Sequence, residues 1–161
     1  AKTVAKRVFG PDVENPSDKQ INFVLGCDSV FVFQNEIFSK PRNSKEAIER
    51  WKRMSSNSGF LITGHAFLFK SLSRSTQRET RFDGLLQEVI STKIHFVDVS
   101  RKEIENYVST GEPMQCAGGF AIEGKGARFI RKIEGCYSNV IGLSLPWLRE
   151  AWIKASISDY S

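Results

Sequence analysis

The chain has 161 residues, of which 40% are hydrophobic and 11% aromatic, and its formal net charge is +5 at pH 7. This composition is that of a globular protein and excludes a largely disordered chain, and no apolar stretch approaches the roughly 20 residues of a membrane span. The positive excess fits a nucleotide phosphate tail or a nucleic acid as partner, but charge alone does not separate these from a merely soluble surface.

The cysteines indicate where the protein resides. Cys27, Cys116 and Cys136 are an odd number at wide spacing, without a Cys-x-x-Cys pair, and the chain has two histidines. This pattern argues against a disulfide framework and indicates a reducing compartment, so a cytoplasmic location is predicted. A structural zinc site is not expected, because the usual ligand spacing is missing.

In the first third of the chain, the sequence predicts a loop followed by a long strand. Residues 1–9 have the apolar pattern of a helix end, and residues 11–20, with two prolines, predict a surface loop. Residues 21–33 predict one or two strands with a break at Gly26–Asp28. Gln34–Asn35 then predicts a tight turn into a further strand.

A helix and two long strands are predicted next. Residues 44–54 have apolar side chains at helical spacing, with Ser44 as the N-cap. Residues 59–69 predict a strand interrupted by Gly64, and the polar residues 71–84 predict a loop or hairpin end. Residues 85–99 alternate near their end and predict a third strand.

The clearest helix signal covers residues 100–111. Ser100 predicts the N-cap, Glu103 completes a capping box, and Gly111 ends the helix. Residues 116–130 alternate glycines with strand residues, and residues 143–155 predict an amphipathic helix. Strands that alternate with helices predict an α/β or α+β domain with a mixed sheet.

Asp28 is the sharpest functional candidate, because it interrupts the apolar strand VLGCDSVFVF. A carboxylate there must be paired, hydrogen-bonded or bound to a cation. Asp28 could hold a divalent ion or take a proton from an attacking water. It could equally cap the next turn through backbone N–H groups, and the local residues leave both roles open.

Other polar residues are weighed against simpler roles. Lys40 is immobilised by Pro41 and suits a phosphate, although a solvated loop lysine is favoured by local sequence alone. Glu123 lies between glycines and strand residues, where a carboxylate can accept hydrogen bonds from a base edge. Glu112 is predicted to be a surface acid at a helix end, and His65 a core histidine rather than a ligand.

Five stretches in this order and spacing resemble the Maf family of nucleoside triphosphate pyrophosphatases, first named for inhibition of septum formation. The stretches are VLGCDSVFVFQNEIFSKP, LITGHAFLF, STKIHFVDVSRKEIENYVSTGEP, CAGGFAIEGKGARFI and EGCYSNVIGLSLPWL. The resemblance runs from residue 1 to about residue 154. It implies one Maf-like domain over residues 1–161, with an α/β fold related to the inosine-triphosphate pyrophosphatases. Its mixed twisted sheet has flanking helices, and two lobes surround a cleft.

The resemblance implies cleavage of a nucleoside triphosphate to the monophosphate and pyrophosphate, with a divalent metal cation, Mg²⁺ or Mn²⁺. The family's proton acceptor falls on Asp28, which is also the expected metal ligand. Substrate-binding lysines of the family fall on Lys2 and Lys40, although Ser39 replaces the glycine of the family's Gly-Lys-Pro motif.

Base preference in the family is set at the positions of Ser29 and Glu123. One branch, which prefers dTTP and UTP, carries threonine and glutamine there, and the 7-methyl-GTP branch carries glutamine and glutamate. Ser29 fits neither branch, and Glu123 matches only the second. An ionised glutamate accepts hydrogen bonds but does not donate them, so it suits the N–H edge of guanine and favours a purine-like or modified base.

The family's first strand and its serine–proline–arginine–arginine loop have no counterpart in this sequence. The prediction is therefore a Maf-like nucleoside triphosphate pyrophosphatase domain that lacks one central strand and two phosphate-binding arginines, a loss that can leave this chain inactive. The alternative function is a non-catalytic nucleotide- or protein-binding regulator of septum formation. A homodimer is implied by the resemblance, and neither nucleic acid nor membrane is expected as a partner.

Overall fold

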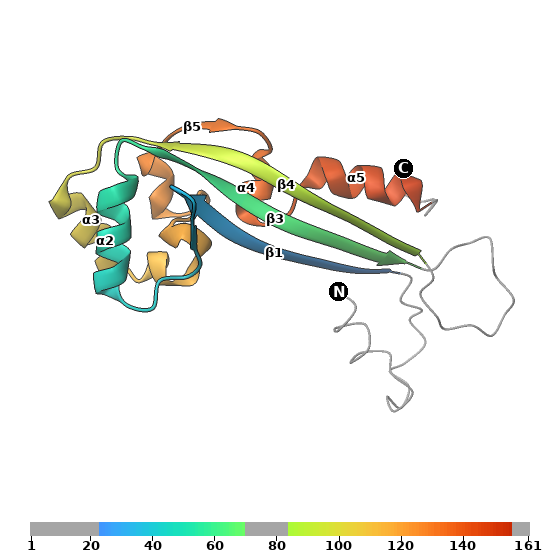
Figure 1. Cartoon of the computed structure of the whole chain (residues 1–161), viewed down its shortest axis with the longest axis horizontal. Helices are drawn as coiled ribbons and strands as arrows, with labels where there is room; N and C mark the ends of the chain where they lie inside the picture. The colour runs from blue at the N-terminus through green and yellow to red at the C-terminus, as the bar shows by residue number, and fades with distance from the viewer. Residues whose placement is uncertain (1–22, 70–83, 156–161) are drawn as a thin grey trace, which may run out of the picture. The chain divides into compact units, whose positions relative to one another are not determined.

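The computed structural model describes residues 23–69 and 84–155, which contain both strands and helices (Figure 1). None of the helices in these two ranges is long and apolar enough to cross a membrane. In chain order the elements are β1 (Phe23–Phe33), β2 (Glu36–Phe38), α2 (Ser44–Met54), β3 (Ser58–Phe69), β4 (Gly84–Phe96), α3 (Arg101–Ser109), η2 (Glu112–Gln115), η3 (Ala117–Gly119), η4 (Lys125–Phe129), β5 (Ile130–Glu134), α4 (Tyr137–Ile141) and α5 (Leu145–Lys154).

The strands form one five-stranded sheet in the order β2-β1-β3-β4-β5. β2 pairs antiparallel with β1, and β5 pairs antiparallel with β4. Figure 1 shows β3 running in the opposite direction to β1 and β4. The predicted α/β fold with a sheet and flanking helices is confirmed, while the parallel pair of a mixed sheet is not found among the described strands.

The long strands are less interrupted than the sequence predicts. β1 continues through the expected break at Gly26–Asp28, so residues 23–33 are one strand. β3 continues through Gly64, where an added Cβ would meet no atom within 4 Å. Hydrogen bonds to neighbouring strands hold the backbone extended at these positions, and a single glycine does not end a paired strand.

The two predicted helix starts have different outcomes. The capping box of α3 is confirmed, because the Ser100 hydroxyl accepts from the Glu103 N–H and the Glu103 carboxylate accepts from the Ser100 N–H. The N-cap of α2 is Asn43, whose side chain accepts from the N–H of Glu46. The prediction of Ser44 as N-cap is therefore wrong by one residue, and Ser44 is the first helical residue.

Residues 116–129, where the sequence alternates glycines with strand residues, form no strand; the short 3-10 helices η3 and η4 lie in this stretch, and η2 precedes it. Gly118 and Gly119 adopt φ angles of 73° and 75°, in the left-handed region that glycine enters without steric cost. These angles turn the chain away from a pleated conformation. Glu123 consequently lies in a turn between η3 and η4, and not beside a strand as the sequence predicts.

The chain divides into two compact units, and β1, β3 and β4 contribute residues to both. Unit 1 comprises residues 1–27, 64–88 and 145–161, and unit 2 comprises residues 28–63 and 89–144. The single domain and the cleft between two lobes stay predictions.

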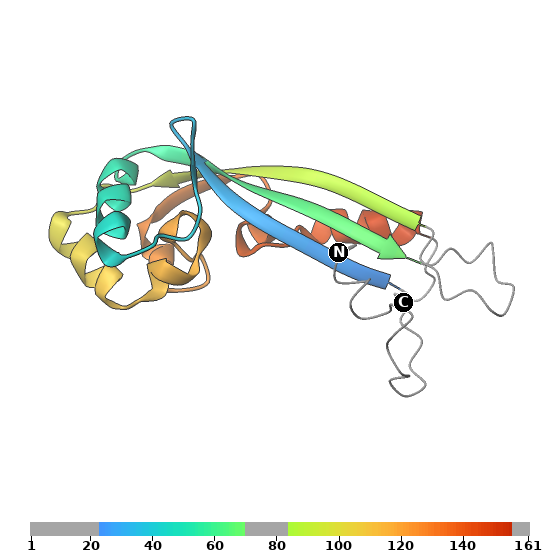
Figure 2. The same ribbon diagram turned by 60° about the horizontal axis from the view of Figure 1, so that its bottom comes forward.

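Unit 2 has a core rich in aromatic residues. α2 and α3 lie side by side (Figures 1 and 2), and Trp51 of α2 is completely buried. The Trp51 ring makes edge contacts with Phe96, Tyr107 and Phe129, with centroids 5.3–5.4 Å apart. Its Nε1 donates to the carbonyl of Gly119 at 2.8 Å, which attaches η3 to this core.

Unit 1 has a separate, smaller core. Phe67 of β3 is completely buried and belongs to one cluster with Ala151 of α5. The ring of His65 lies 4.8 Å from the ring of Trp147, and His65 is 3% exposed. The prediction of a core histidine at position 65 is confirmed.

Candidate active site

Asp28 lies on β1 with its side chain exposed. Its Oδ1 accepts a hydrogen bond from the N–H of Ser29 at 3.0 Å, which is the backbone contact that a capping role uses. Oδ2 has no hydrogen-bond partner among the described residues. An exposed carboxylate with one unengaged oxygen can reach a bound ligand, as a general base must.

The side chain of Ser29 points to the opposite face of the sheet from Asp28, because successive side chains of a strand alternate. Ser29 shares its face with the buried Phe31 and Phe33. Its hydroxyl lies 2.8 Å from Oγ1 of Thr63. Asp28 is therefore exposed, whereas Ser29 is half-buried and its hydroxyl contacts a buried threonine.

A buried polar cluster continues from Thr63. Thr63 Oγ1 donates to the carbonyl of Asn139 at 3.3 Å, and Asn139 Nδ2 donates to Oγ1 of Thr92 at 3.1 Å. All three side chains are completely buried. Their contacts join β3, β4 and α4 beneath Ser29, so the protein interior holds the Ser29 hydroxyl. Thr92 and Asn139 were not identified from the sequence as members of this buried cluster. For Thr92 a signal existed, because it is a polar residue at a strand position that faces the interior.

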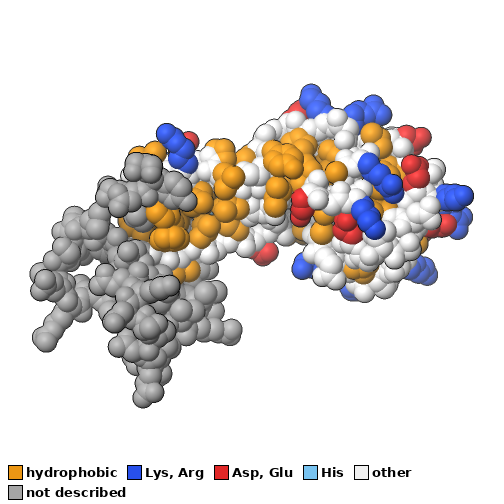
Figure 3. Space-filling view, turned by 180° about the vertical axis from the view of Figure 1, so that it is seen from behind, with side chains coloured by type: hydrophobic (Ala, Val, Ile, Leu, Met, Phe, Trp, Pro, Cys, Tyr) orange, Lys and Arg blue, Asp and Glu red, His pale blue; other side chains and the backbone are white. Residues whose placement is uncertain are grey.

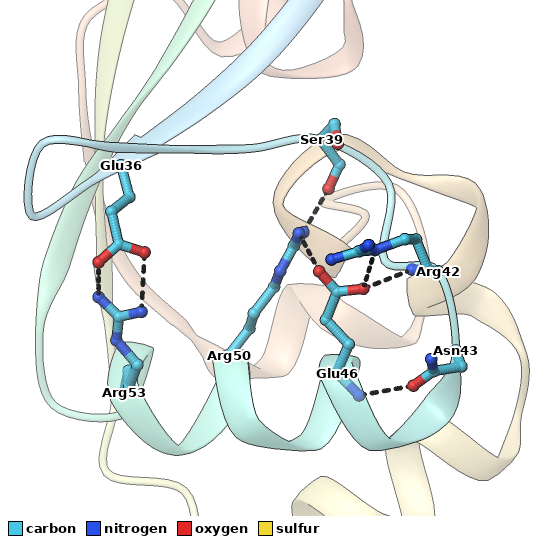
Figure 4. A network of polar contacts seen from close by, with 7 residues as sticks. All are labelled: Glu36, Ser39, Arg42, Asn43, Glu46, Arg50 and Arg53. Atoms are coloured by element: carbon cyan, nitrogen blue, oxygen red, sulfur yellow. Dashed lines mark hydrogen bonds and ion pairs between the residues drawn. The ribbon is translucent and has the colours of Figure 1, made fainter.

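Lys40 lies in the exposed loop between β2 and α2. Arg50 of α2 donates from Nη1 to the carbonyl of Ser39 and from Nη2 to Oε1 of Glu46 (Figure 4). The guanidinium carbon of Arg50 also lies 4.7 Å from the ring centroid of Phe38. Because these contacts fix Arg50, it anchors the backbone just before Lys40.

Glu46 anchors the same loop just after Lys40. Its Oε2 accepts from the backbone N–H of Arg42 at 2.9 Å (Figure 4). This hydrogen bond from the Arg42 backbone, helped by the charge of Arg50, lowers the pKa of the Glu46 carboxyl. The loop is therefore tied to α2 on both sides of the lysine.

Substitution of Arg50 tests this anchoring. In the reaction that the sequence resemblance implies, Arg50→Met is expected to lower kcat/KM about tenfold, because a hydrogen bond from a charged group is worth about 1.5–3 kcal/mol and its loss frees the Lys40 loop. Lys52→Met is the control, since it removes a cation from the same helix and breaks only the exposed pair with Glu49. Equal kcat/KM values for the two variants would contradict a role of Arg50 in holding Lys40.

Glu123 is exposed. The charge of Glu123 and the charge of Lys40 both act on the thiol of Cys116. Burial, followed by the charges of Glu123 and Glu112, raises the pKa of the Cys116 thiol, while the charge of Lys40 opposes this. None of the described contacts joins Asp28 to Lys40 or Glu123, and Lys2 lies outside the described residues.

Glu112 of η2 is half-buried and accepts three hydrogen bonds. Oε1 accepts from the Tyr107 hydroxyl at 2.6 Å and from the N–H of Gly126 at 2.9 Å. Oε2 accepts from the N–H of Lys125 at 2.9 Å. Glu112 is at a helix end and partly exposed, as predicted, but donors up to 14 residues away converge on its carboxylate, which the sequence does not predict.

The ionisation of Glu112 should make stability depend on pH. Burial opposes ionisation, but hydrogen bonds from Tyr107, Lys125 and Gly126 outweigh it and lower the pKa of Glu112 from 4.5. A carboxylate with a lowered folded-state pKa stabilises the fold above the unfolded-state pKa and loses this contribution as pH falls through the folded-state pKa.

We therefore expect Glu112→Gln to lower the Tm at neutral pH, and the Tm difference from the unmodified chain to shrink as pH falls below about 4.5. Thermal unfolding followed by circular dichroism measures both values. Glu150→Gln, at an exposed position of α5, is the control and should leave the Tm unchanged at either pH. If the Tm difference for Glu112→Gln stayed constant from neutral pH to below about 4.5, the ionised Glu112 carboxylate would not be the group that stabilises the fold.

An open groove of about 430 Å³ adjoins Glu112 within unit 2. It is lined by Thr110, Gly111, Glu112, Gln115 and Lys125. Grooves of this volume accommodate small ligands, and this one combines carboxylate, ammonium, hydroxyl and amide groups. Lys125, which lines the groove, is the first residue of η4 and directly follows the turn that carries Glu123.

The candidate metal ligand is Asp28 alone. Within residues 23–69 and 84–155, no group of three or more His, Cys, Asp or Glu side chains could hold a metal ion. The exposed Oδ2 of Asp28 still suits Mg²⁺, which is commonly bound through one or two carboxylates, substrate phosphates and waters. The donor set therefore fits an ion that arrives with a nucleotide, and does not form a cage for a resident ion.

At the right end of the face drawn in Figure 3, Lys and Arg side chains are interspersed with Asp and Glu, while the surface between this end and the grey atoms is largely hydrophobic or uncharged. Several of the cations in the described ranges are paired, as in Arg53–Glu36, Lys52–Glu49 and Arg101–Glu105. A nucleic-acid surface usually gathers cations on one face or along one helix. The distribution on this face gives no support to nucleic acid as a partner.

Comparisons with known proteins show a close likeness over most of the chain. A family model described as Maf-like protein matches residues 1–155. A nucleoside triphosphate pyrophosphatase of Prochlorococcus marinus is 56% identical over 135 residues, which are 84% of this chain and 65% of that protein. One of Parasynechococcus marenigrum is 52% identical over 137 residues, 85% of this chain and 65% of that protein. The chain thus spans a little under two thirds of the length of these curated relatives.

Proposed function

The chain belongs to the Maf-like protein family, and from this premise we propose that it acts as a nucleoside triphosphate pyrophosphatase. It would hydrolyse a nucleoside triphosphate to the monophosphate and pyrophosphate. The relatives named for this activity support the proposal. The observation that carries it to this chain is the exposed carboxylate of Asp28, in the strand where the family places its proton acceptor.

In the proposed reaction a water attacks the α-phosphorus. Asp28 accepts the proton of that water, and the bond from the α-phosphorus to the bridging oxygen breaks, so pyrophosphate leaves with the electron pair. Lys40 and Lys2 would bind phosphate oxygens and offset their negative charge. A divalent cation, Mg²⁺ or Mn²⁺, bound to Asp28 and the phosphates would add positive charge there when present.

We propose that Glu123 and Ser29 contribute to the choice of base. Glu123 is exposed on a turn, so its carboxylate can accept hydrogen bonds from the N–H edge of a guanine-like base. Ser29 acts from within the polar cluster with Thr63, which limits the side chains that fit at its position. A homodimer in the cytoplasm, with a role in septum formation, completes the proposal.

The test is product analysis with a panel of purine, pyrimidine and 7-methylated nucleoside triphosphates, with Mg²⁺ or Mn²⁺. The expected products are the monophosphate and pyrophosphate, and EDTA should abolish their release. Release of orthophosphate would contradict the proposed bond cleavage. Nucleotide binding without any turnover would favour the alternative function, a non-catalytic regulator.

A further inference from the structure

We propose that Glu112 is a positioning residue that sets the base selectivity of this chain by fixing the turn that carries Glu123. The inference rests on the proposed function, because it assigns a role within the same site. It concerns a residue that does not itself need to touch the base. Three sets of contacts in unit 2 support it.

The first set anchors the turn after Glu123. The carboxylate of Glu112 accepts from the backbone N–H groups of Lys125 and Gly126, each at 2.9 Å. Two backbone donors on one ionised carboxylate form charge-assisted hydrogen bonds, which are stronger than bonds between neutral groups. The chain is therefore held in place two residues beyond Glu123.

The second set anchors the turn before Glu123. The Tyr107 hydroxyl donates to Glu112 at 2.6 Å and accepts from the N–H of Ala121 at 3.4 Å. Tyr107 is completely buried and is fixed by its ring contact with Trp51. The path from Ala121 through Tyr107 and Glu112 to Lys125 therefore closes around the turn, with Glu123 between the two anchors.

The third set consists of two glycines of the turn, which let the backbone come close to Glu112 and Tyr107. A Cβ added to Gly124 would lie 2.5 Å from Oε2 of Glu112, and a Cβ added to Gly126 would lie 2.5 Å from the Tyr107 hydroxyl oxygen. Only glycine leaves room for both contacts. Gly124 and Gly126 thus allow the backbone to close on Glu112 and Tyr107.

The expected consequence is a loss of discrimination without a loss of the carboxylate of Glu123. A side chain that reads a base edge must be held within a fraction of an ångström, because a looser site accepts competing bases more readily. In Glu112→Gln the amide keeps only one acceptor oxygen, so one of the N–H groups of Lys125 and Gly126 loses its acceptor and Glu123 samples several positions.

The experiment compares base selectivity, defined as the ratio of kcat/KM for GTP to that for UTP, with the Tm of each variant. Glu112→Gln is expected to reduce the ratio about tenfold, towards the ratio of Glu123→Gln. Tyr107→Phe keeps both backbone bonds to Glu112 and should reduce the ratio less. Glu103→Gln is the matched control, because it weakens the capping box of α3 and leaves the turn untouched.

A double variant separates positioning from a general structural effect. If Glu112 acts through Glu123, then Glu112→Gln should change the ratio very little in a Glu123→Gln background, because coupled residues are not additive. An unchanged ratio in Glu112→Gln, with turnover retained and a Tm loss like that of Glu103→Gln, would overturn the inference.

Failure of the proposed function gives a different result. In that case the unmodified chain releases no pyrophosphate from any nucleotide in the panel. Selectivity is then measured as the ratio of Kd values for GTP and UTP by equilibrium dialysis on the same variants. A Kd ratio that Glu112→Gln leaves unchanged would overturn the inference independently of turnover.

Discussion

Asp28→Asn is expected to lower kcat for pyrophosphate release by about 10²–10⁴-fold, the usual contribution of a positioned general base. The amide has the same shape as the carboxylate, and its oxygen can still accept from the N–H of Ser29. It cannot accept a proton from the attacking water. Because Asp28 is exposed, the Tm should be unaffected by the change.

The control for Asp28→Asn is Asp98→Asn. Asp98 is also exposed, and its carboxylate accepts hydrogen bonds from the hydroxyls of Ser55 and Ser56. This variant should keep the kcat of the unmodified chain. Measured with GTP and UTP under saturating conditions, unchanged turnover in Asp28→Asn would show that another group accepts the proton.

Trp51→Ala is expected to reduce the free energy of unfolding by about 3–5 kcal/mol. The side chain is completely buried and packs against Phe96, Tyr107 and Phe129. Its removal leaves a cavity among rigid rings, and the carbonyl of Gly119 loses the indole N–H donor. Urea denaturation, read from far-UV circular dichroism, measures the change.

Trp51→Phe separates the two contributions. A phenylalanine keeps part of the aromatic packing but lacks the N–H that binds the carbonyl of Gly119. We expect this variant to lose less than Trp51→Ala, about 1–3 kcal/mol, the cost of an unsatisfied buried acceptor. If Trp51→Ala lost under about 1 kcal/mol, Trp51 would not be central to the unit 2 core.

The sequence predicts most elements where the signal is local. The capping box of α3 needs only Ser100 and Glu103, and it forms as predicted. At α2, two adjacent residues, Asn43 and Ser44, are both good N-caps, and local propensity does not rank them. The structure selects Asn43, whose side chain accepts from the N–H of Glu46.

The segment around η3 is predicted wrongly because its conformation depends on distant contacts. Its alternation of glycines with apolar residues suggests a strand, but Gly118 and Gly119 adopt left-handed φ angles. An added Cβ at Gly118 would lie 2.7 Å from Cβ of Phe31, and Gly119 accepts from Trp51. These partners lie far away in sequence, so a pattern of neighbouring residues does not contain them.

In the candidate site, too, contacts between residues that are distant in sequence are not predicted. Asp28 stands out in the sequence because a buried carboxylate would be costly, but the structure leaves its side chain exposed, so that cost does not arise. The bond between Thr63 and Asn139 joins residues 76 positions apart, and nothing in either local stretch predicts it. Glu112 resembles a surface acid until the turn from Ala121 to Gly126 folds back onto it. The roles of Asp28, Ser29, Lys40 and Glu123 stay predictions.

The side chains of β1 alternate between the two faces of the sheet. The adjacent candidates Asp28 and Ser29 are therefore subject to different constraints on the residues that can replace them. Replacements at position 29 must fit against Thr63 and the phenylalanines of the same face, so steric and hydrogen-bonding compatibility filters them first. Replacements at position 28 meet solvent, so they leave the packing of unit 2 undisturbed. Position 29 is therefore tied to the stability of the fold, whereas position 28 tolerates sequence change without a cost to folding.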